Sequence, residues 1–151
     1  MKLEIFCLFV LATAANTERA CDNGWLPYKN HCYWFSPSPD TFHYAVIICS
    51  EKGSKLLEIK DAREEKWVLL QSRIRGYSLV WIGLTDVVDD GQYVFLSSGL
   101  TSRYSNWDKG EPGGGTIENC VGLQTKGRKW HDYLCTNKFF YVCKKPAKHF
   151  V

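Results

Sequence analysis

The stretch EPGGGTIENC, residues 111–120, raises the question on which the interpretation of the chain depends. Two carboxylates, Glu111 and Glu118, flank a run of three glycines, and a cysteine follows. Such a stretch is either a flexible connection with acidic edges or a loop that presents oxygen ligands to a metal ion. Phosphate binding is disfavoured, because no lysine stands at the spacing of a P-loop and the carboxylates would repel phosphate.

Length and composition indicate one folded domain. The chain has 151 residues, of which 15% are aromatic and 23% charged, and this is not a disordered composition. Its formal net charge of +3 is too small to indicate nucleic-acid binding. We expect the tail KKPAKH, residues 144–149, to be a solvated terminus.

The first residues predict secretion. Lys2 precedes an apolar run from Ile5 to Leu11, and Ala12-Thr13-Ala14 is typical of a cleavage site, so we assign residues 1–15 to a signal peptide, with Ala20 as the alternative end. This run is too short for a membrane-spanning helix, which needs about 20 apolar residues, and no other segment comes closer. The mature protein is therefore expected to be extracellular, with no membrane span.

The cysteines support this compartment. Removal of Cys7 with the signal peptide leaves an even number, which in an oxidising compartment points to three disulfides. There is no C-x-x-C pair to suggest a redox or metal site. Six cysteines permit many connectivities, and their count does not choose among them; they are Cys21, Cys32, Cys49, Cys120, Cys135 and Cys143.

The N-terminal half predicts a hairpin and a helix. Residues 21–36 form two aromatic-rich runs separated by the turn residues Lys29 and Asn30. Residues 41–52 carry apolar side chains at helical spacing and stop at Gly53. The side chains of this spacing are Phe42, Ala45, Val46 and Cys49.

A second helix is expected to begin at Asp61 and to end at Gly76. Asp61 and Glu64 have the spacing of a capping box. The inner face predicted from the apolar spacing consists of Trp67, Leu70 and Ile74.

From Ser78 onward the pattern changes to short strand-like runs: SLVWIGL, GQYVFL, NCVGLQ, RKWHDY and FFYVC. Residues 95–120 contain many turn residues and few apolar ones, and a long irregular loop in a compact domain is usually functional. The fold class is therefore α+β.

These features together resemble the C-type lectin-like domain over residues 21–146. The resemblance rests on the hairpin, the two helices, WIGL, YSNW, the E-P pair, ENC, WHD and the six cysteines, all in order. It implies two helices with small antiparallel sheets and a long ligand loop, and it leaves residues 147–151 as a short basic tail. It also implies the pairs Cys21–Cys32, which marks the long form of the domain, Cys49–Cys143 and Cys120–Cys135. Within the family, the hairpin and the secreted format are most similar to mollusc perlucin-like lectins of the shell matrix.

In sugar-binding members of this family a calcium ion in the long loop ligates sugar hydroxyls. The resemblance assigns Glu111, Glu118 and Asp132 as its carboxylate ligands, and it places a cis bond before Pro112. The two family amides, which give an oxygen to calcium and an NH₂ group to the sugar, are absent. Gly113 replaces the asparagine of an E-P-N triplet, and His131 replaces that of W-N-D. Glu111, Glu118, His131 and Asp132 are the expected carbohydrate-binding residues, with His131 as a substitute donor.

An auxiliary calcium site of the family falls in TDVVDD, after WIGL. The resemblance assigns Asp86 and Asp90 to it, with Glu118 shared and Asn119 offering an oxygen. The alternative is a solvated turn, because an Asp-Gly pair such as that at residues 90–91 is also ordinary hairpin chemistry.

Other conspicuous residues have structural explanations. Core packing is the expected role of the motif tryptophans, Trp81, Trp107 and Trp130. The pair formed by His131 and Asp132 has no Ser or Cys nucleophile motif beside it, so we expect no enzyme, although a histidine with two acids also suits zinc. The basic run TKGRKW forms either a charged hairpin turn or a rim that contacts acidic or sulfated glycans; its charges are Lys126, Arg128 and Lys129.

The predicted function is that of a secreted C-type lectin that binds carbohydrate with the help of Ca²⁺ through a degenerate sugar site. Its expected partners are glycans or glycoproteins, with matrix polysaccharide or calcium mineral as further partners. The alternative is a structural or interaction module of an extracellular or shell matrix that keeps the fold and has lost sugar binding.

Overall fold

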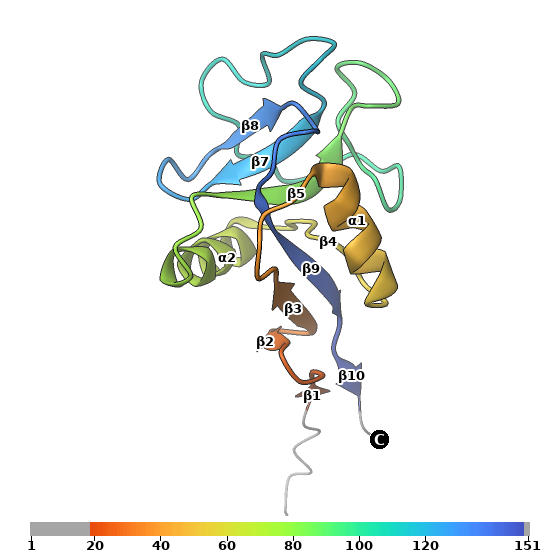
Figure 1. Ribbon diagram of the computed structural model, residues 1–151, viewed down its shortest axis with the longest axis vertical. Helices are drawn as coiled ribbons and strands as arrows, with labels where there is room; N and C mark the ends of the chain where they lie inside the picture. The colour runs from red at the N-terminus through yellow and green to blue at the C-terminus, as the bar shows by residue number, and fades with distance from the viewer. Residues whose placement is uncertain (1–18, 150–151) are drawn as a thin grey trace, which may run out of the picture.

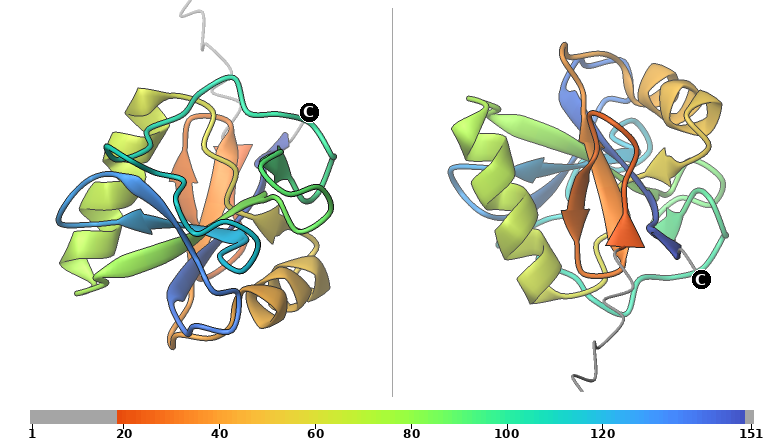
Figure 2. Two further views of the ribbon diagram at one scale, coloured as in Figure 1. Left: turned by 90° about the horizontal axis from the view of Figure 1, so that it is seen from above. Right: turned by 90° about the horizontal axis from the view of Figure 1, so that it is seen from below.

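The computed structural model describes residues 19–149, and the predicted signal peptide, residues 1–15, lies outside the described residues (Figure 1). Two helices flank a central sheet on separate sides, which both views of Figure 2 show. The elements are β1 (Arg19–Ala20), β2 (Leu26–Tyr28), β3 (His31–Phe35), α1 (Phe42–Glu51), β4 (Lys55–Leu56), α2 (Ala62–Ile74), β5 (Leu79–Thr85), β6 (Val94–Phe95), β7 (Cys120–Gln124), β8 (Trp130–Tyr133), β9 (Phe140–Pro146) and β10 (Lys148–His149). The expected α+β class is confirmed.

The main sheet has eight strands, and its longest path runs β2-β3-β9-β5-β7-β8, with β4 on β9 and β6 on β5. All strand pairs are antiparallel except β5 with β9, where Val80 faces Phe140. The resemblance implied small, separate antiparallel sheets. The parallel pairing of β5 with β9 instead joins the strands into one mixed sheet. The short pair β1–β10 lies at the end that carries both termini, opposite β7 and β8 (Figure 1).

All three expected disulfides are present. They join Cys21 to Cys32, Cys49 to Cys143 and Cys120 to Cys135. The first fastens the N-terminal hairpin, in which Lys29 takes the left-handed conformation of the turn (φ 52°).

Helix α1 begins and ends where the sequence predicts. The side chain of Thr41 caps it by accepting a hydrogen bond from the Tyr44 amide, and Gly53 follows its end with a positive φ of 64°. Its buried face is made of Phe42, Ala45 and Cys49, which confirms the predicted apolar face.

Helix α2 starts after the predicted cap, Asp61, but its predicted inner face is wrong. Leu70 and Ile74 are 55% and 69% exposed, whereas Trp67 is half-buried. The buried face is rotated around the helix axis from the predicted one. The carboxylates of Glu64 and Glu65, in the first turn, are buried because they have hydrogen-bond partners inside the protein. The buried residues are Glu64, Glu65, Val68, Leu69 and Ser72.

A buried ion pair connects α2 to β9. The Lys144 ammonium contacts the carboxylate of Glu64 and donates a hydrogen bond to the Glu58 carbonyl at 2.9 Å. The Tyr33 hydroxyl donates to the same Glu64 oxygen at 2.7 Å. Burial lowers the pKa of Lys144, and the attraction of Glu64 opposes that shift.

The expectation of a solvated tail is therefore wrong for most of residues 144–149. Lys144 is buried, Lys145 forms an ion pair with Asp22 at 2.6 Å, and Lys148 belongs to β10. The segment extends β9 and pairs with the N-terminal part of the domain.

Aromatic side chains fill the core. Trp81 and Trp130 are fully buried, and Trp107 packs half-buried against the ring of Trp130, with ring centroids 5.9 Å apart. Core packing, as expected, explains all three. Among residues 19–149, no helix has the length and apolar character needed to cross a membrane.

Candidate functional site

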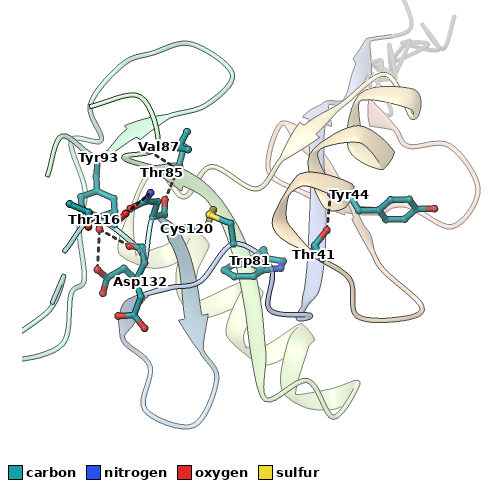
Figure 3. The surroundings of a disulfide bond; sticks show 12 residues. Thr41, Tyr44, Trp81, Thr85, Val87, Tyr93, Thr116, Cys120 and Asp132 are labelled. Atoms are coloured by element: carbon teal, nitrogen blue, oxygen red, sulfur yellow. Dashed lines mark hydrogen bonds between the residues drawn. A yellow bond between two sulfur atoms is a disulfide. The ribbon is translucent and has the colours of Figure 1, made fainter. Parts of the chain in front are cut away.

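The long loop leaves β6 and returns at β7, at the end of the molecule away from the termini (Figure 1). The Cys120–Cys135 disulfide joins the start of β7 to the segment after β8, and Figure 3 shows its surroundings. In the β7–β8 register Val121 faces Asp132 and Gly122 faces His131. The predicted residues of the WHD motif are thereby placed beside the loop that carries EPGGGTIENC.

Asp132 anchors this loop. Its side chain is buried, and its two oxygens accept hydrogen bonds from the Gly113 amide at 3.1 Å and the Gly114 amide at 3.0 Å. The Tyr93 hydroxyl donates to the second oxygen at 3.1 Å (Figure 3). The glycine run is therefore held by one carboxylate, and the Glu111–Pro112 bond that precedes it is cis.

The carboxyl groups of Glu111 and Asp132 share a hydrogen bond. This bond, together with burial, raises the pKa of Glu111 above its ordinary value. Burial opposes the ionisation of Asp132, but the hydrogen bonds that it accepts from Glu111, Gly113 and Gly114 outweigh burial and lower its pKa. Of the two groups, Asp132 is the one that carries the negative charge at lower pH.

Tyr93 lies between the acidic groups of the site. Burial and the nearby carboxylates of Asp132 and Asp86 raise the pKa of its hydroxyl well above the ordinary value. The hydroxyl therefore keeps its proton and remains a donor.

His131 bridges two carboxylates. Its Nε2 lies 3.0 Å from Asp108 Oδ2 and its Nδ1 lies 3.4 Å from Glu111 Oε1, while its ring stacks on Tyr133 at 6.1 Å. The hydrogen bond with His131 and that with the Lys109 amide hold the pKa of Asp108 below its usual range, the amide contributing more. The side chains of His131 and Glu111 are 21% and 24% exposed, so both are open to a ligand at the surface.

Glu118 packs against the glycine run. A Cβ atom on Gly114 would lie 2.2 Å from the Cβ of Glu118 and 2.0 Å from its Oε2, so a side chain at Gly114 would displace Glu118. Close packing of this kind is one reason for a glycine in a ligand loop. The structure thus places Glu111 and Glu118 on one loop, with His131 and Asp132 beside it on β8.

The carboxylates of the predicted sugar site do not fit a calcium ion as they stand. Both oxygens of Asp132 already accept hydrogen bonds from the loop, and those bonds would have to break before the oxygens could ligate a metal. As the side chains stand, no three His, Cys, Asp or Glu residues among residues 19–149 are gathered into a group that could hold a metal ion, so neither predicted calcium site has its full set of carboxylates in place. The assignment of Glu111, Glu118 and Asp132 as calcium ligands therefore stays a prediction.

The residues of the predicted auxiliary site offer a better fit. Asp86 Oδ1 and Asn119 Oδ1 are buried and have no hydrogen-bond partner within the described chain. The two residues are neighbours, because the Asp86 amide donates to the Asn119 carbonyl at 3.3 Å. Two buried oxygens without donors are costly unless a cation or water completes them, and both are ligand types that Ca²⁺ prefers. Asp90 is exposed on the adjoining turn.

Two residues of the site were missed by the sequence reasoning. Tyr93, which donates to Asp132, stands in a predicted strand and has no sequence signal that separates it from a core tyrosine. Asp108 stands three residues before Glu111, and a search for acids near the E-P pair would have found it.

Two of the basic residues of TKGRKW, Arg128 and Lys129, line a groove along α2, and Lys129 donates to Asn106 Oδ1 at 2.7 Å. Lys126 is exposed. The run forms the turn between β7 and β8, and the alternative of a rim that contacts acidic glycans stays a prediction.

Comparison with known proteins agrees with this geometry. The family model described as Lectin C-type domain matches residues 38–145. A perlucin-like protein of Mytilus galloprovincialis is 28% identical over 147 residues, which cover 93% of this chain and 94% of that protein. The CD209 antigen of Papio hamadryas is 35% identical over 131 residues, which cover 85% of this chain but 36% of the antigen, so the chain spans about a third of that relative. Among solved structures, the human scavenger receptor C-type lectin carbohydrate-recognition domain is 31% identical with a TM-score of 0.76, and the alignment covers 84% of this chain and 99% of that one.

Proposed function

The chain belongs to the C-type lectin domain family, and on this premise we propose that it is a glycan-binding protein rather than an enzyme. The observation that carries the proposal is the pair formed by Glu111 and His131. Both side chains are partly exposed and lie beside each other, Glu111 on the loop that Asp132 fastens through two backbone amides and His131 on β8. A carboxylate that accepts hydrogen bonds and an imidazole that donates them suit the vicinal hydroxyls of a sugar, which would replace the contacts of His131 with Asp108 and Glu111.

We assign the calcium requirement to Asp86 and Asn119, whose unpartnered buried oxygens would hold the ion, with Asp90 and Glu118 as the further predicted ligands. When bound, calcium supplies positive charge that satisfies these oxygens. The chain's own contribution is to hold Glu118 and Asn119 at the end of the loop. The Tyr93 hydroxyl already contacts the Glu118 carbonyl at 3.4 Å and Asp132 at 3.1 Å. Calcium bound at Asn119 would therefore also hold the neighbouring Glu118 and, through Tyr93, Asp132, which lies beside the proposed glycan site.

A calcium titration tests this assignment. With a Kd of about 1 mM, which is ordinary for an extracellular site, about 10 mM Ca²⁺ should stabilise the protein by about 1.4 kcal/mol. The melting temperature, followed by near-UV circular dichroism, should then rise by about 5 °C. Asp86→Asn should abolish the rise, because it removes a ligand charge. Asp89→Asn on the same exposed turn is the matched control and should keep it. A full rise in Asp86→Asn would refute this site.

Glycan binding is tested separately on a glycan array, with calcium and with EDTA. Binding of the protein to a glycan in calcium but not in EDTA would support calcium-assisted binding. Binding under both conditions would show that sugar binding does not need the metal. A second function, an interaction module without sugar binding, is favoured by one observation: Gly113 has no side chain where the family's amide stands. Absence of every glycan signal from a correctly folded protein would favour that function.

Restoring the two amides should create conventional hexose binding. In the variant Gly113→Asn/His131→Asn both donors return, and we expect retention on mannose-agarose in calcium with elution by EDTA, whereas the wild-type protein should not be retained. The position accepts a side chain with a small adjustment, because a Cβ on Gly113 would lie 3.2 Å from the Gly110 carbonyl oxygen. His131→Asn alone is the control. If the double variant binds calcium but not mannose, loss of the amides does not explain the altered site.

We further propose that the protein is secreted after removal of residues 1–15, with residues 21–146 as the lectin domain. Glycoproteins and matrix polysaccharide are its proposed partners, and the acidic loop offers carboxylates to calcium mineral. Mass spectrometry of the secreted chain, expressed in animal cells, tests the cleavage site.

A further inference from the structure

A groove of about 1000 Å³ runs along α2, and none of the residues proposed for the glycan site lines it. Helix α2 forms one wall, and the residues around Tyr104 and the β7–β8 turn form the other. Its floor is apolar: Trp67 is half-buried and stacks on Tyr28 at 4.7 Å, and Leu70 is 55% exposed. Leu70, which the apolar pattern of α2 predicted to be buried, is therefore part of the surface of this groove.

The rim of this groove is basic. Five of its lining residues are cationic, and none of these forms an ion pair with a carboxylate of residues 19–149. The one lining carboxylate, Glu65, is buried and already accepts a hydrogen bond from the Trp130 indole at 2.6 Å. The cations are Arg63, Lys66, Arg73, Arg128 and Lys129. Arg73 donates to the Thr125 carbonyl and Lys129 to Asn106, so the groove offers cations without a carboxylate partner around an apolar floor.

The turn after β5 has the complementary chemistry. In the segment DVVDD, residues 86–90, which we call the acidic turn, Val87 is 58% and Val88 82% exposed (Val87 is labelled in Figure 3). Asp89 and Asp90 beside them are exposed as well. The Gly91 amide donates to Asp86 Oδ2 at 2.8 Å and the Asp89 amide to the Asp86 carbonyl at 3.1 Å, so these bonds hold the turn in shape. Two adjacent exposed valines between carboxylates are an apolar tip with an acidic edge.

We propose that the acidic turn of one copy docks in the α2 groove of a second copy, so that the protein associates head to tail. Val87 and Val88 would cover the floor formed by Trp67 and Leu70, while the carboxylates face the basic rim. An acidic polysaccharide would pair with the rim but would leave Leu70 exposed to its polar groups, which favours a partner with apolar side chains.

The two surfaces cannot meet within one molecule. Four residues lie between the end of helix α2 and the start of β5, and the acidic turn follows the other end of this strand. A strand of seven residues separates them by about 20 Å. Because one such contact leaves a free turn on one copy and a free groove on the other, association can continue into chains or rings. The area of one short turn is small, so association is weak and reversible.

Sedimentation equilibrium over a concentration series, in EDTA, tests the proposal independently of the calcium site and of sugar binding. Wild-type protein should show a mass that rises with concentration beyond that of a dimer. The groove variant Arg63→Glu/Lys66→Glu and the turn variant Asp89→Lys/Asp90→Lys should each weaken association at least tenfold. The control Arg103→Glu/Lys126→Glu makes the same charge change at exposed positions outside the groove and should associate like wild type.

Mixing the two reversed variants gives the decisive result. The groove variant keeps an acidic turn and the turn variant keeps a basic groove, and the reversed groove and the reversed turn complement each other as well. An equimolar mixture should therefore associate at concentrations at which each variant alone stays monomeric. A wild-type protein that stays monomeric at every concentration overturns the proposal, as does a mixture that stays monomeric. Binding of heparin that the groove variant loses, with no self-association of wild type, would assign the groove to a polyanion instead. Circular dichroism of each variant checks that it is folded.

Discussion

Replacing Glu64 by glutamine is expected to lower the free energy of unfolding by about 3–5 kcal/mol, because it leaves the buried ammonium of Lys144 without its counter-ion. Lys144 is 3% exposed, and apart from Glu64 its hydrogen-bonding partner is the Glu58 carbonyl. Glutamine keeps the shape of the side chain and still accepts a hydrogen bond from the Tyr33 hydroxyl, but its NH₂ group cannot accept the bond that the Lys60 amide donates to the second oxygen of Glu64 at 2.8 Å. The loss therefore contains the cost of this bond as well as that of the charge. Urea denaturation followed by tryptophan fluorescence measures the loss.

The pH dependence of this loss identifies its cause. Burial lowers the pKa of Lys144 in the folded protein, and loss of Glu64 lowers it further. A lysine with a lower pKa when folded destabilises the protein below that pKa, and the penalty vanishes as pH rises to the unfolded value of about 10.4. The difference between wild type and variant should therefore shrink in the alkaline range below the unfolded pKa, as Lys144 loses its proton in the folded protein.

Two variants complete the test of the ion pair. Glu64→Gln/Lys144→Met removes both charges and should recover most of the stability. Glu51→Gln changes an exposed carboxylate of α1 and should cost little. If Glu64→Gln behaves like Glu51→Gln, the buried pair does not stabilise the fold.

The helix boundaries could be predicted from the sequence, but the buried face of α2 could not. Thr41 and Asp61 act locally, because each caps a helix through an amide three residues away. The periodicity of α2 counts Glu64 and Glu65 as polar and therefore external. Their partners come from strands distant in the chain, and no local pattern reveals them.

The site was predicted in part for the same reason. The resemblance named Glu111, Glu118, His131 and Asp132, and they do lie on or beside one loop. It could not show that Asp132 is already occupied by amides of Gly113 and Gly114, because backbone donors leave no signature in the sequence. The unpartnered oxygens of Asp86 and Asn119 are likewise a property of the packed structure.

The two predicted calcium sites differ in fit although each has three carboxylates in sequence. In the sugar site the loop has closed on one of them, Asp132. In the auxiliary site two oxygens, those of Asp86 and Asn119, are buried without a donor. Calcium should accordingly bind first at Asp86 and Asn119 and should act on glycan affinity through the position of Glu118.

Removing the Cys49–Cys143 disulfide should lower the free energy of unfolding by about as much as Glu64→Gln does. The bridge closes a loop of 94 residues, both cysteines are fully buried, and it ties α1 to β9, which pairs with β3, β4 and β5. The chain-entropy model gives a loss of about 4–5 kcal/mol for Cys49→Ala/Cys143→Ala, measured by urea denaturation under non-reducing conditions.

The N-terminal disulfide is the matched control for this prediction. Cys21–Cys32 closes 11 residues, so Cys21→Ala/Cys32→Ala should cost about 3 kcal/mol on the same model. The free energy of unfolding of a domain is about 5–15 kcal/mol in total. Loss of Cys49–Cys143 therefore removes a large share of it, and loss of Cys21–Cys32 removes a smaller share. Equal losses for the two pairs would contradict the chain-entropy explanation. A larger loss for the hairpin pair would mean that residues 21–36, rather than the contact between α1 and β9, carry the stability of the domain.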